Sequence, residues 1–405
     1  MLKLFKIYAS AYHGLPRQAW LLFLVILVNR SGMMVVFFMS LYLTRHLHFS
    51  TTQAGQLIGI FGVGSLVGAY GGGWLTDKIG SFRVQLYSLL STAVAMIILG
   101  YMHSFGSIAA MLVVVAILND ALRPASITAF AEICPPELQA RAFAFNRLAV
   151  NLGTAIGPAV GGYLVTIHYG LIFWVDALTC LASGILFFFL FRRVPPGHGR
   201  PKEEKPASGP LSPWKDRFFL LLMAGFLSLG IIFFQLFNTW PLYLRDFLNI
   251  PEPRIGLLLT LNALMIVVIE MPMVHRLEAR PPLQVAVFGS VFVWSGFALL
   301  NAGSSYGFVA LTVMIWTMGE MLVFPMTAAT IAGRARDYNR GVYMGIYTLT
   351  FSMSFVIGPV VGSWVYDTWG PRTLWYAAGI AGALITLALG RLYYISKAEQ
   401  AKQAV

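Results

Sequence analysis

Twelve long apolar runs constrain this chain more than any other feature, because each is long enough to cross a membrane. A spanning helix needs about 20 mostly apolar residues to cross roughly 30 Å of hydrocarbon. Apolar residues make up 58% of the 405 residues and charged residues 11%, whereas about 25% are charged in an ordinary soluble domain. We therefore predict an all-α integral membrane protein. Its spans lie near residues 19–44, 52–75, 84–103, 107–133, 142–167, 169–191, 218–243, 254–275, 284–302, 306–333, 341–365 and 373–393.

The basic residues lie mainly in the gaps between these runs and predict how the chain is oriented. Lys and Arg outnumber Asp and Glu by 28 to 16, for a net charge of +12, and loops rich in Lys and Arg stay in the cytoplasm. Both termini are therefore predicted to be cytoplasmic, in a cell inner (plasma) membrane. The basic excess is a topology signal, so we expect no binding to nucleic acid. The loops assigned to the outside carry only Arg45, Arg245, Arg254 and Arg372.

The first apolar run follows Lys3, Lys6 and Arg17, an arrangement that also starts a secretory signal peptide. The run is longer than the apolar region of a signal peptide, and it lacks a small-residue cleavage site. We interpret it as a retained first helix.

The spans divide six and six around one long connection. Residues 192–217 are rich in Pro, Gly and charge, the composition of a flexible cytoplasmic linker, and they separate an N-terminal half (1–191) from a C-terminal half (218–405). Several residues recur at an offset of 201: Gly157-Pro158 as Gly358-Pro359, Gly161 as Gly362, Trp174 as Trp375 and Pro124 as Pro325. Such matches indicate an internal repeat. Two repeated halves that rock about a central site are typical of alternating-access transporters.

The connection between spans 2 and 3 carries a motif of small and charged residues. It contains Gly73, Asp77, Lys78, Gly80 and Arg83 and resembles the signature loop of the major facilitator superfamily. Asp77 can cap the start of the next helix and pair with Arg83, so we expect the loop to latch one conformation. The alternative is a plain hairpin that obeys the positive-inside rule.

Span 5 carries a second motif, which is similar to the one associated with the drug and proton antiporters of that superfamily. Gly153, Gly157 and Gly161 recur every four residues and form a smooth face for close helix contact, while Pro158 permits a bend. The alternative is ordinary helix packing. The resemblance implies two pseudo-symmetric six-helix halves, with spans 1, 4, 7 and 10 lining a central cavity. The repeat counterparts in span 11 are Gly358, Pro359 and Gly362.

Ionisable residues midway along spans are the strongest functional candidates, because each costs at least ~2.5–3.5 kcal/mol at a helix centre. Arg30 lies in span 1, Asp120 and Arg123 in span 4, and Glu320 in span 10. Asp120 and Arg123 are three residues apart and share a helix face. We expect Glu320, Asp120 or Glu270, near the cytoplasmic end of span 8, to carry a coupling proton. The alternative for Arg30, Asp120 and Arg123 is a structural ion-pair cluster.

Polar groups on spans 1, 4 and 7 are expected to line the substrate cavity. They are Asn29, Arg30, Arg123, Gln235, Asn238 and Trp240. A mostly apolar cavity with few polar groups suits amphiphilic or aromatic substrates. Other charges in or near the spans have both functional and structural interpretations: Asp176, Glu270 with Arg276 as a partner, and Arg147 with Glu132 as a partner.

Spans 1 and 4 also depart from the family pattern. Drug antiporters commonly carry an arginine followed by a Gln-Gly pair in span 4, whereas residues 119–124 read NDALRP. Arg123 therefore need not match the arginine to which that family's proton relay is attributed. The Asn29-Arg30 pair is not part of the antiporter pattern either, and it resembles importers that bind a carboxylate in span 1.

The function predicted from these features is secondary active transport, most simply proton-coupled export of amphiphilic or drug-like small molecules by alternating access. The alternative is an importer or uniporter of a small organic anion or peptide-like substrate bound by Arg30 and Arg123, and a remote one is a non-transporting receptor or lipid scramblase. No phosphate-binding loop, HExxH or GxSxG motif is present, so we expect no enzyme and no cofactor. Cys134 and Cys180 lack disulfide or metal-site spacing. We expect a monomer in the lipid bilayer whose partners are a small-molecule substrate and protons.

Overall fold

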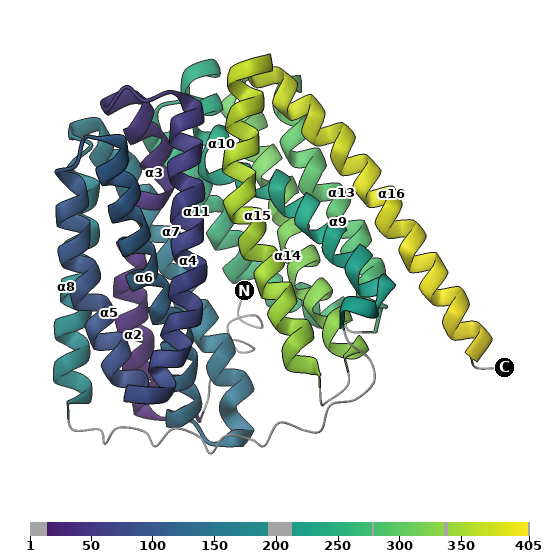
Figure 1. The fold of residues 1–405 in the computed structure, drawn as a ribbon, viewed down its shortest axis with the longest axis horizontal. Helices are drawn as coiled ribbons and strands as arrows, with labels where there is room; N and C mark the ends of the chain where they lie inside the picture. Colours follow the sequence, from purple (N-terminus) through teal and green to yellow (C-terminus); the bar gives the residue numbers. More distant parts are fainter. Residues whose placement is uncertain (1–13, 193–212, 278, 336–338, 404–405) are drawn as a thin grey trace. The chain divides into compact units, whose positions relative to one another are not determined.

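A computed structural model describes residues 14–192, 213–277, 279–335 and 339–403 (Figure 1). These residues are all-helical, and twelve of the helices are long and apolar enough to cross a membrane. The predicted all-α fold with twelve spans is therefore confirmed. Most of the predicted linker, residues 193–212, and the first 13 residues lie outside the described residues.

The first six spans are built from helices joined by short turns. Span 1 consists of two helices and a one-turn π-helix, and each of the next five spans is one helix. The bounds are α2 (Arg17–Ser31), α3 (Val35–Leu41), the π-helix Tyr42–His46, α4 (Thr51–Ile79), α5 (Ser81–Gly100), α6 (Phe105–Ile133), α7 (Gln139–Ile167) and α8 (Leu171–Phe191).

The last six spans repeat this order, with breaks in spans 7 and 8. The bounds are α9 (Arg217–Phe233), the 3-10 turn Phe234–Phe237, α10 (Thr239–Leu242), the π-helix Tyr243–Phe247, α11 (Glu252–Met265), the π-helix Ile266–Glu270, α12 (Met271–Leu277), α13 (Pro282–Ala298), α14 (Tyr306–Arg334), α15 (Arg340–Trp369) and α16 (Pro371–Gln403).

The sequence repeat is also a repeat of local structure at the same offset of 201 residues. The π-helices at Tyr42–His46 and Tyr243–Phe247 correspond. Each is followed by a non-glycine residue with positive φ, His48 at 58° and Asn249 at 54°. Asn and His are among the residues that adopt this region most readily. The turn after the first span of each half is therefore closed in the same way.

The helices form two compact units, and each unit takes residues from both halves of the sequence. Unit 1 comprises Met1–Phe38, Ile60–Pro201 and Glu252–Leu264, and unit 2 comprises Met39–Gly59, Lys202–Pro251 and Met265–Val405. The start of α11 thus packs with the first half, and the start of α4 packs with the second.

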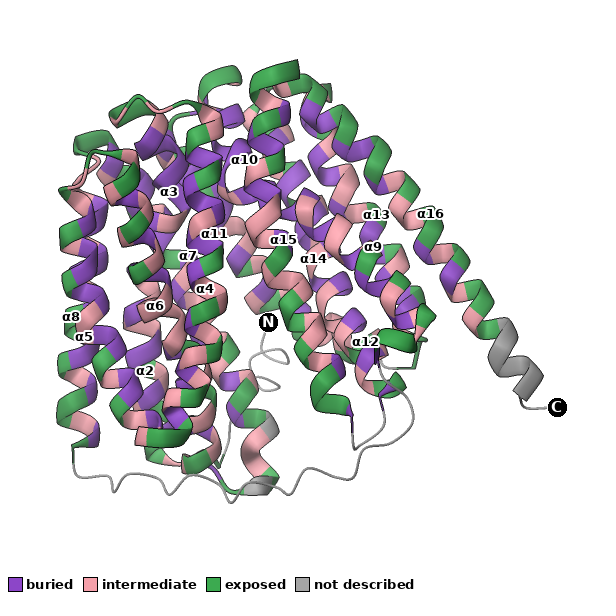
Figure 2. Ribbon diagram, in the orientation of Figure 1, coloured by how far each residue is buried: buried purple, intermediate pink, exposed green. Residues whose placement is uncertain are grey.

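Many large apolar side chains are exposed, as expected for helices that face lipid. Tyr70 is 84% exposed, Leu387 70% and Ile380 66%, and buried and exposed residues alternate along α16 (Figure 2). Lipid tails are as apolar as leucine, so such faces need no protein cover.

Candidate functional site

The first span is broken near its middle. α2 ends at Ser31, residues 32–34 form a turn, and α3 begins at Val35. A Ser-Gly pair is a common cause of helix kinks. A Cβ on Gly32 would lie 1.7 Å from Thr179 Oγ1 of α8, so glycine is needed for α8 to approach the break.

Asp176 of α8 caps the second part of this broken span. The residue is 5% exposed, and its carboxylate accepts hydrogen bonds from the backbone N–H groups of Met34 and Val35, where α3 begins. Helix N-termini favour an anionic acceptor at this place. The contacts therefore favour the structural interpretation of Asp176.

Polar groups continue from Asp176 to α2. Cys180 lies one turn further along α8, donates to Asp176 Oδ1 at 3.8 Å and accepts from Asn29 Nδ2 at 3.4 Å. All three residues are buried. Asn29, expected to line the substrate cavity, is thus used here to tie α2 to α8.

The charged candidates of spans 1 and 4 lie near one another without direct contact. Arg30, Asp120 and Arg123 interact electrostatically, but in the described part of the chain no hydrogen bond or salt bridge joins them. Asp120 accepts a hydrogen bond from Ser65 of α4, and Arg30 Nη1 lies 3.4 Å from Met33 Sδ. The structural ion-pair cluster therefore stays a prediction, and the hydrogen-bond partners of Asp120 and Arg30 in this structure are Ser65 and Met33.

Span 7 is interrupted at the place that corresponds to the break in span 1. α9 gives way to a 3-10 turn at Phe234–Phe237, and Asn238 separates this turn from α10. Gln235 Nε2 donates to the Gly358 carbonyl at 2.7 Å, and Asn238 Nδ2 donates to the Pro359 carbonyl at 3.3 Å. The break in span 7 is therefore held by the repeated motif of span 11.

The three polar or aromatic residues expected to line the cavity from span 7 are all buried. Gln235 is 2% exposed, and Asn238 and Trp240 are 0% exposed. The indole N–H of Trp240 has no hydrogen-bond partner among the described residues. Their contact with substrate remains a prediction.

The glycine motifs of spans 5 and 11 make close contact with the broken spans. A Cβ on Gly153 would lie 2.5 Å from Arg30 Cβ, and one on Gly362 would lie 1.7 Å from Gln235 Oε1. The smooth face expected of these glycines is thus in use in both halves. A Cβ added to each of the other glycines would also be close to a neighbour: 2.8 Å from the Met33 carbonyl oxygen for Gly157, 2.7 Å from Met34 Cβ for Gly161 and 3.1 Å from the Ile231 carbonyl oxygen for Gly358.

The prolines of the same motifs contact helices from the other half of the sequence. A Cβ on Gly256 of α11 would lie 2.1 Å from the Pro158 carbonyl oxygen, and one on Gly55 of α4 would lie 2.6 Å from the Pro359 carbonyl oxygen. The glycines and the prolines both differ by the repeat offset. The first contact belongs to unit 1 and the second to unit 2, so one backbone contact occurs twice.

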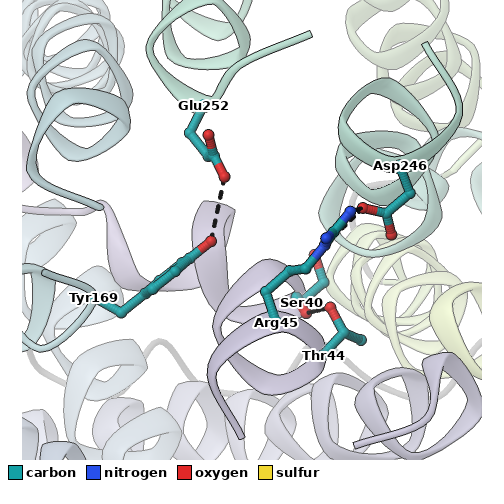
Figure 3. Close-up of polar contacts among 6 residues, drawn as sticks. All are labelled: Ser40, Thr44, Arg45, Tyr169, Asp246 and Glu252. Carbon is teal, nitrogen blue, oxygen red and sulfur yellow. Dashed lines mark hydrogen bonds and ion pairs between the residues drawn. The ribbon is translucent and has the colours of Figure 1, made fainter. Parts of the chain in front are cut away.

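Polar contacts tie the loops at the predicted outer end of the spans (Figure 3). Within unit 2, Arg45 forms a salt bridge with Asp246, with Nε 2.8 Å from Oδ1, and the two residues are 201 positions apart. Within unit 1, the Tyr169 hydroxyl donates to Glu252 Oε1 at 3.3 Å. Each contact joins the two halves of the sequence.

The loop between α4 and α5 differs from the expected latch. Gly80, with φ of +89°, is the residue just before α5, and no side chain caps that helix. Asp77 and Arg83 are exposed and have no hydrogen bond or ion pair to another described residue, so the predicted capping and pairing are wrong for this structure. The positive φ of Gly80 makes the turn without a cap. The side-chain contact here is from Ser81 Oγ to Glu132 Oε2, at 2.6 Å.

Of the glycines at the end of α4, Gly72 approaches another helix closely and Gly73 does not. A Cβ on Gly72 would lie 2.4 Å from Ala121 Cα of α6, whereas one on Gly73 would meet nothing within 4 Å. Gly73 is therefore not a packing residue in this conformation.

Glu320 lies on α14 one helical turn before an aromatic group that joins α9, α14 and α15. Phe324 lies 5.1 Å from Phe233 and 5.3 Å from Phe351, measured between ring centroids. Residues four apart on a helix share a face, so Glu320 and Phe324 lie on the same side of α14. Glu320, Phe324 and Phe351 are half-buried.

Glu270 is buried and ends the one-turn π-helix Ile266–Glu270. Single π turns inside α-helices are frequent at functional sites. From the sequence we predicted that Glu270 lies near the end of span 8, but we did not predict the π-helix at this position.

Sequence reasoning missed Gly55 and Gly256, although a signal for them was present. Both glycines match at the offset of 201, as the predicted motif residues do. The repeat gives no signal for the hydrogen bonds of Asp176 to the start of α3, because the residue 201 positions later is Ala377, which has no carboxylate.

The chain matches a known family along most of its length. The model of the Major Facilitator Superfamily matches residues 21–352 and 322–404. Among curated relatives, an uncharacterized MFS-type transporter, YttB of Bacillus subtilis (strain 168), is 25% identical over 89% of this chain and 91% of the relative. Multidrug resistance protein 1 of the same organism is 22% identical over 85% of this chain and 87% of the relative.

Solved structures resemble the chain in fold. One of them is the crystal structure of a peptide transporter, POT, in complex with sulfate. The match covers 95% of this chain and 95% of the transporter, with a TM-score of 0.77 and 16% sequence identity. At that identity the likeness concerns the fold alone.

Proposed function

Because the chain belongs to the Major Facilitator Superfamily, and is a transporter and not an enzyme, we propose that it exports amphiphilic, drug-like small molecules in exchange for protons. The observation that carries this proposal is the position of Glu320 on α14, one helical turn before Phe324, which packs against Phe233 of α9 and Phe351 of α15. The curated relative named a multidrug resistance protein supports the same substrate class.

The aromatic group offers a surface for flat or apolar substrates. Phe234 lies 5.0 Å from both Phe351 and Phe355, measured between ring centroids, and Phe351 and Phe355 are half-buried. Aromatic faces attract organic cations, and a few polar groups on a mostly apolar surface fix orientation. Aromatic cations therefore fit this surface best.

Glu320 supplies the group that exchanges a proton for such a cation. A carboxyl group in a cavity that opens alternately to each side is favoured neutral when enclosed and ionised when hydrated. The ionised form attracts a cation, and protonation releases it. Asp120 and Glu270 are the other carboxyl groups that could serve this role.

The broken spans and the repeated glycine–proline contacts provide the moving parts. Discontinuous helices near a central site are typical of secondary transporters. In this proposal the contacts of Gly55 with Pro359 and of Gly256 with Pro158 hold the outer end closed, and export requires them to separate. Both termini are cytoplasmic in this orientation.

A second candidate is import of a small organic anion. Arg30 interacts electrostatically with Asp120 and Asp176, and Arg123 interacts with Asp120. Arg123 is also exposed. A carboxylate-bearing substrate could bind there. Arg123→Gln should abolish uptake of such an anion but leave export of an aromatic cation largely intact.

The test uses the purified chain in vesicles with an imposed pH gradient and ethidium, a fluorescent aromatic cation. The parent should concentrate ethidium against its gradient when protons flow the opposite way. Glu320→Gln, which mimics the protonated carboxyl, should lose this uphill step and bind ethidium more weakly. Glu137→Gln, at an exposed position outside the spans, is the matched control. Uphill transport by Glu320→Gln at the parental rate would exclude Glu320 as the carrier and leave Asp120 and Glu270. A parent that does not couple ethidium to protons would overturn the proposal.

A further inference from the structure

A polar cavity lies at the end of unit 2 where α9, α13 and α15 begin and α14 and α16 end. Its volume is about 1140 Å³, large against the roughly 300–1,000 Å³ of typical small-molecule sites. The charge pattern predicts that this end faces the cytoplasm. The lining residues that carry the argument are Lys215, Asp216, Arg217, Gln284, Arg334 and Lys397.

Two of the charged side chains in the cavity wall, Asp216 and Arg334, form a salt bridge and balance each other. Arg334 makes two contacts with Asp216, Nε to Oδ2 at 2.6 Å and Nη2 to Oδ1 at 2.7 Å, and the Tyr343 hydroxyl donates to the same carboxylate at 3.0 Å. Burial raises the pKa of Asp216, but these hydrogen bonds and one from the Phe219 N–H outweigh it and hold the pKa below its ordinary value. Asp216 is therefore ionised at neutral pH and is matched by Arg334.

Three cations in the same wall have no such partner. Lys215, Arg217 and Lys397 are exposed and make no hydrogen bond or ion pair with another described residue. α13 also begins here at Pro282 with no side-chain cap, so its dipole adds to the positive potential. Among the described lining residues, positive charge is therefore in excess.

The corresponding place in the first half is apolar and filled. At the offset of 201 residues, Leu15, Ile133, Ala142 and Phe82 stand where the second half has Asp216, Arg334, Tyr343 and Leu283. Leu15 and Ala142 are buried in one hydrophobic cluster, against which Ile133 and Phe82 pack. The fold therefore does not require a polar cavity at this end of a six-helix half.

We propose that this cavity binds the phosphate group of an anionic phospholipid. The cations match a phosphate diester, and apolar lining from Phe218 and Leu283 suits the glycerol and the start of the acyl chains. Basic pockets between membrane helices on the cytoplasmic side are known to take anionic head groups. Such a lipid bridges α9 and α16 through Arg217 and Lys397 and stabilises their packing.

The test titrates phosphatidylglycerol into the detergent-purified chain and follows the rise in unfolding temperature. A variant that combines Lys215→Gln, Arg217→Gln and Lys397→Gln should bind about a hundredfold more weakly, since each cation near an anionic lipid contributes about a fivefold factor. Arg391→Gln removes an exposed cation from α16 outside the cavity and should change binding less than twofold. Phosphatidylcholine should give no comparable stabilisation.

Two further arms separate the alternatives. Gln284→Glu keeps an acceptor for the Tyr393 hydroxyl, now 3.4 Å from Gln284 Oε1, and adds a negative charge, so it should weaken phosphatidylglycerol binding even if the triple variant does not fold. Inorganic phosphate that stabilises the parent as well as the lipid does would overturn the lipid as ligand. Equal stabilisation of the parent and the folded variants by phosphatidylglycerol would overturn the site.

Discussion

Gly256→Ala tests whether the repeated backbone contact keeps the outer end closed. The new methyl group would lie 2.1 Å from the Pro158 carbonyl oxygen and 2.9 Å from its carbon. These are backbone atoms inside α7, so no rotation of a side chain can relieve the clash. α7 and α11 must move apart wherever this contact forms.

The magnitude follows from the cost of overpacking. Extra methyl groups in close-packed interfaces cost about 1–3 kcal/mol, which shifts a two-state equilibrium by roughly 5- to 150-fold. In the proposed outward-open state the two helices are separated, so the methyl group destabilises only the state that has the contact. Gly256→Ala should therefore raise the population of the outward-open state by that factor.

The assay measures labelling of Ser40→Cys by a membrane-impermeant maleimide added from outside. Ser40 is 0% exposed, and both native cysteines are buried, so labelling reports opening. The rate should rise about 5- to 150-fold in Gly256→Ala. Gly106→Ala, in α6 with nothing within 4 Å of the new Cβ, should leave it unchanged.

A second perturbation of the same contact avoids overpacking. Thr260→Val removes the hydrogen bond from Thr260 Oγ1 to the Ala155 carbonyl, 2.6 Å long, and should raise labelling about fivefold if the bond contributes about 1 kcal/mol. Parental labelling and parental transport in folded Gly256→Ala would refute the reasoning.

Three further predictions follow from the polar contacts. Asp176→Ala should lower the unfolding temperature because the Val35 N–H loses its acceptor, at about 1–3 kcal/mol, and the Met34 N–H keeps only the Gly32 carbonyl. Asp176→Asn, which keeps one acceptor oxygen, should lose less, and equal losses in a thermal melt would argue against the cap. The Arg45–Asp246 salt bridge joins side chains that are 45% and 36% exposed, so Arg45→Gln or Asp246→Asn should each shift Ser40→Cys labelling only about 1.4- to 5-fold, and the double variant no further. Because the folded pKa of Asp216 is depressed, its stabilisation is present above the unfolded pKa of about 3.9 and is lost as pH falls through the folded value. The difference in unfolding temperature between the parent and Asp216→Asn should therefore shrink from pH 7 toward pH 3, and a difference that grows in acid would contradict the assignment.

Much of the architecture could be read from the amino-acid pattern. The bilayer has a set thickness, so the length of each apolar run predicted a span, and all twelve are present. The offset of 201 residues predicted a repeat, and the positive-φ turns at His48 and Asn249 reproduce it. These features depend on local composition and on spacing along the chain.

The charged candidates show where that reasoning stopped. An ion-pair cluster was one interpretation of Arg30, Asp120 and Arg123, and the hydrogen bond from Ser65 to Asp120 was not predicted. Asp77 was expected to pair across its loop, yet it is exposed. A charge in the sequence has several possible partners, and the helix that packs nearest selects one.

The run lengths and the repeat offset thus determine how many spans form and in what order, because hydrocarbon thickness and local backbone preference act on each segment separately. The partners of Asp176, Gln235 and Gly256 arise only when helices distant in the sequence meet. Their contacts are with backbone atoms, such as the N–H of Met34 and the carbonyl of Pro158. Every residue has a carbonyl group and every residue except proline has an N–H group, so the side chains do not show in advance which of these groups another helix will reach.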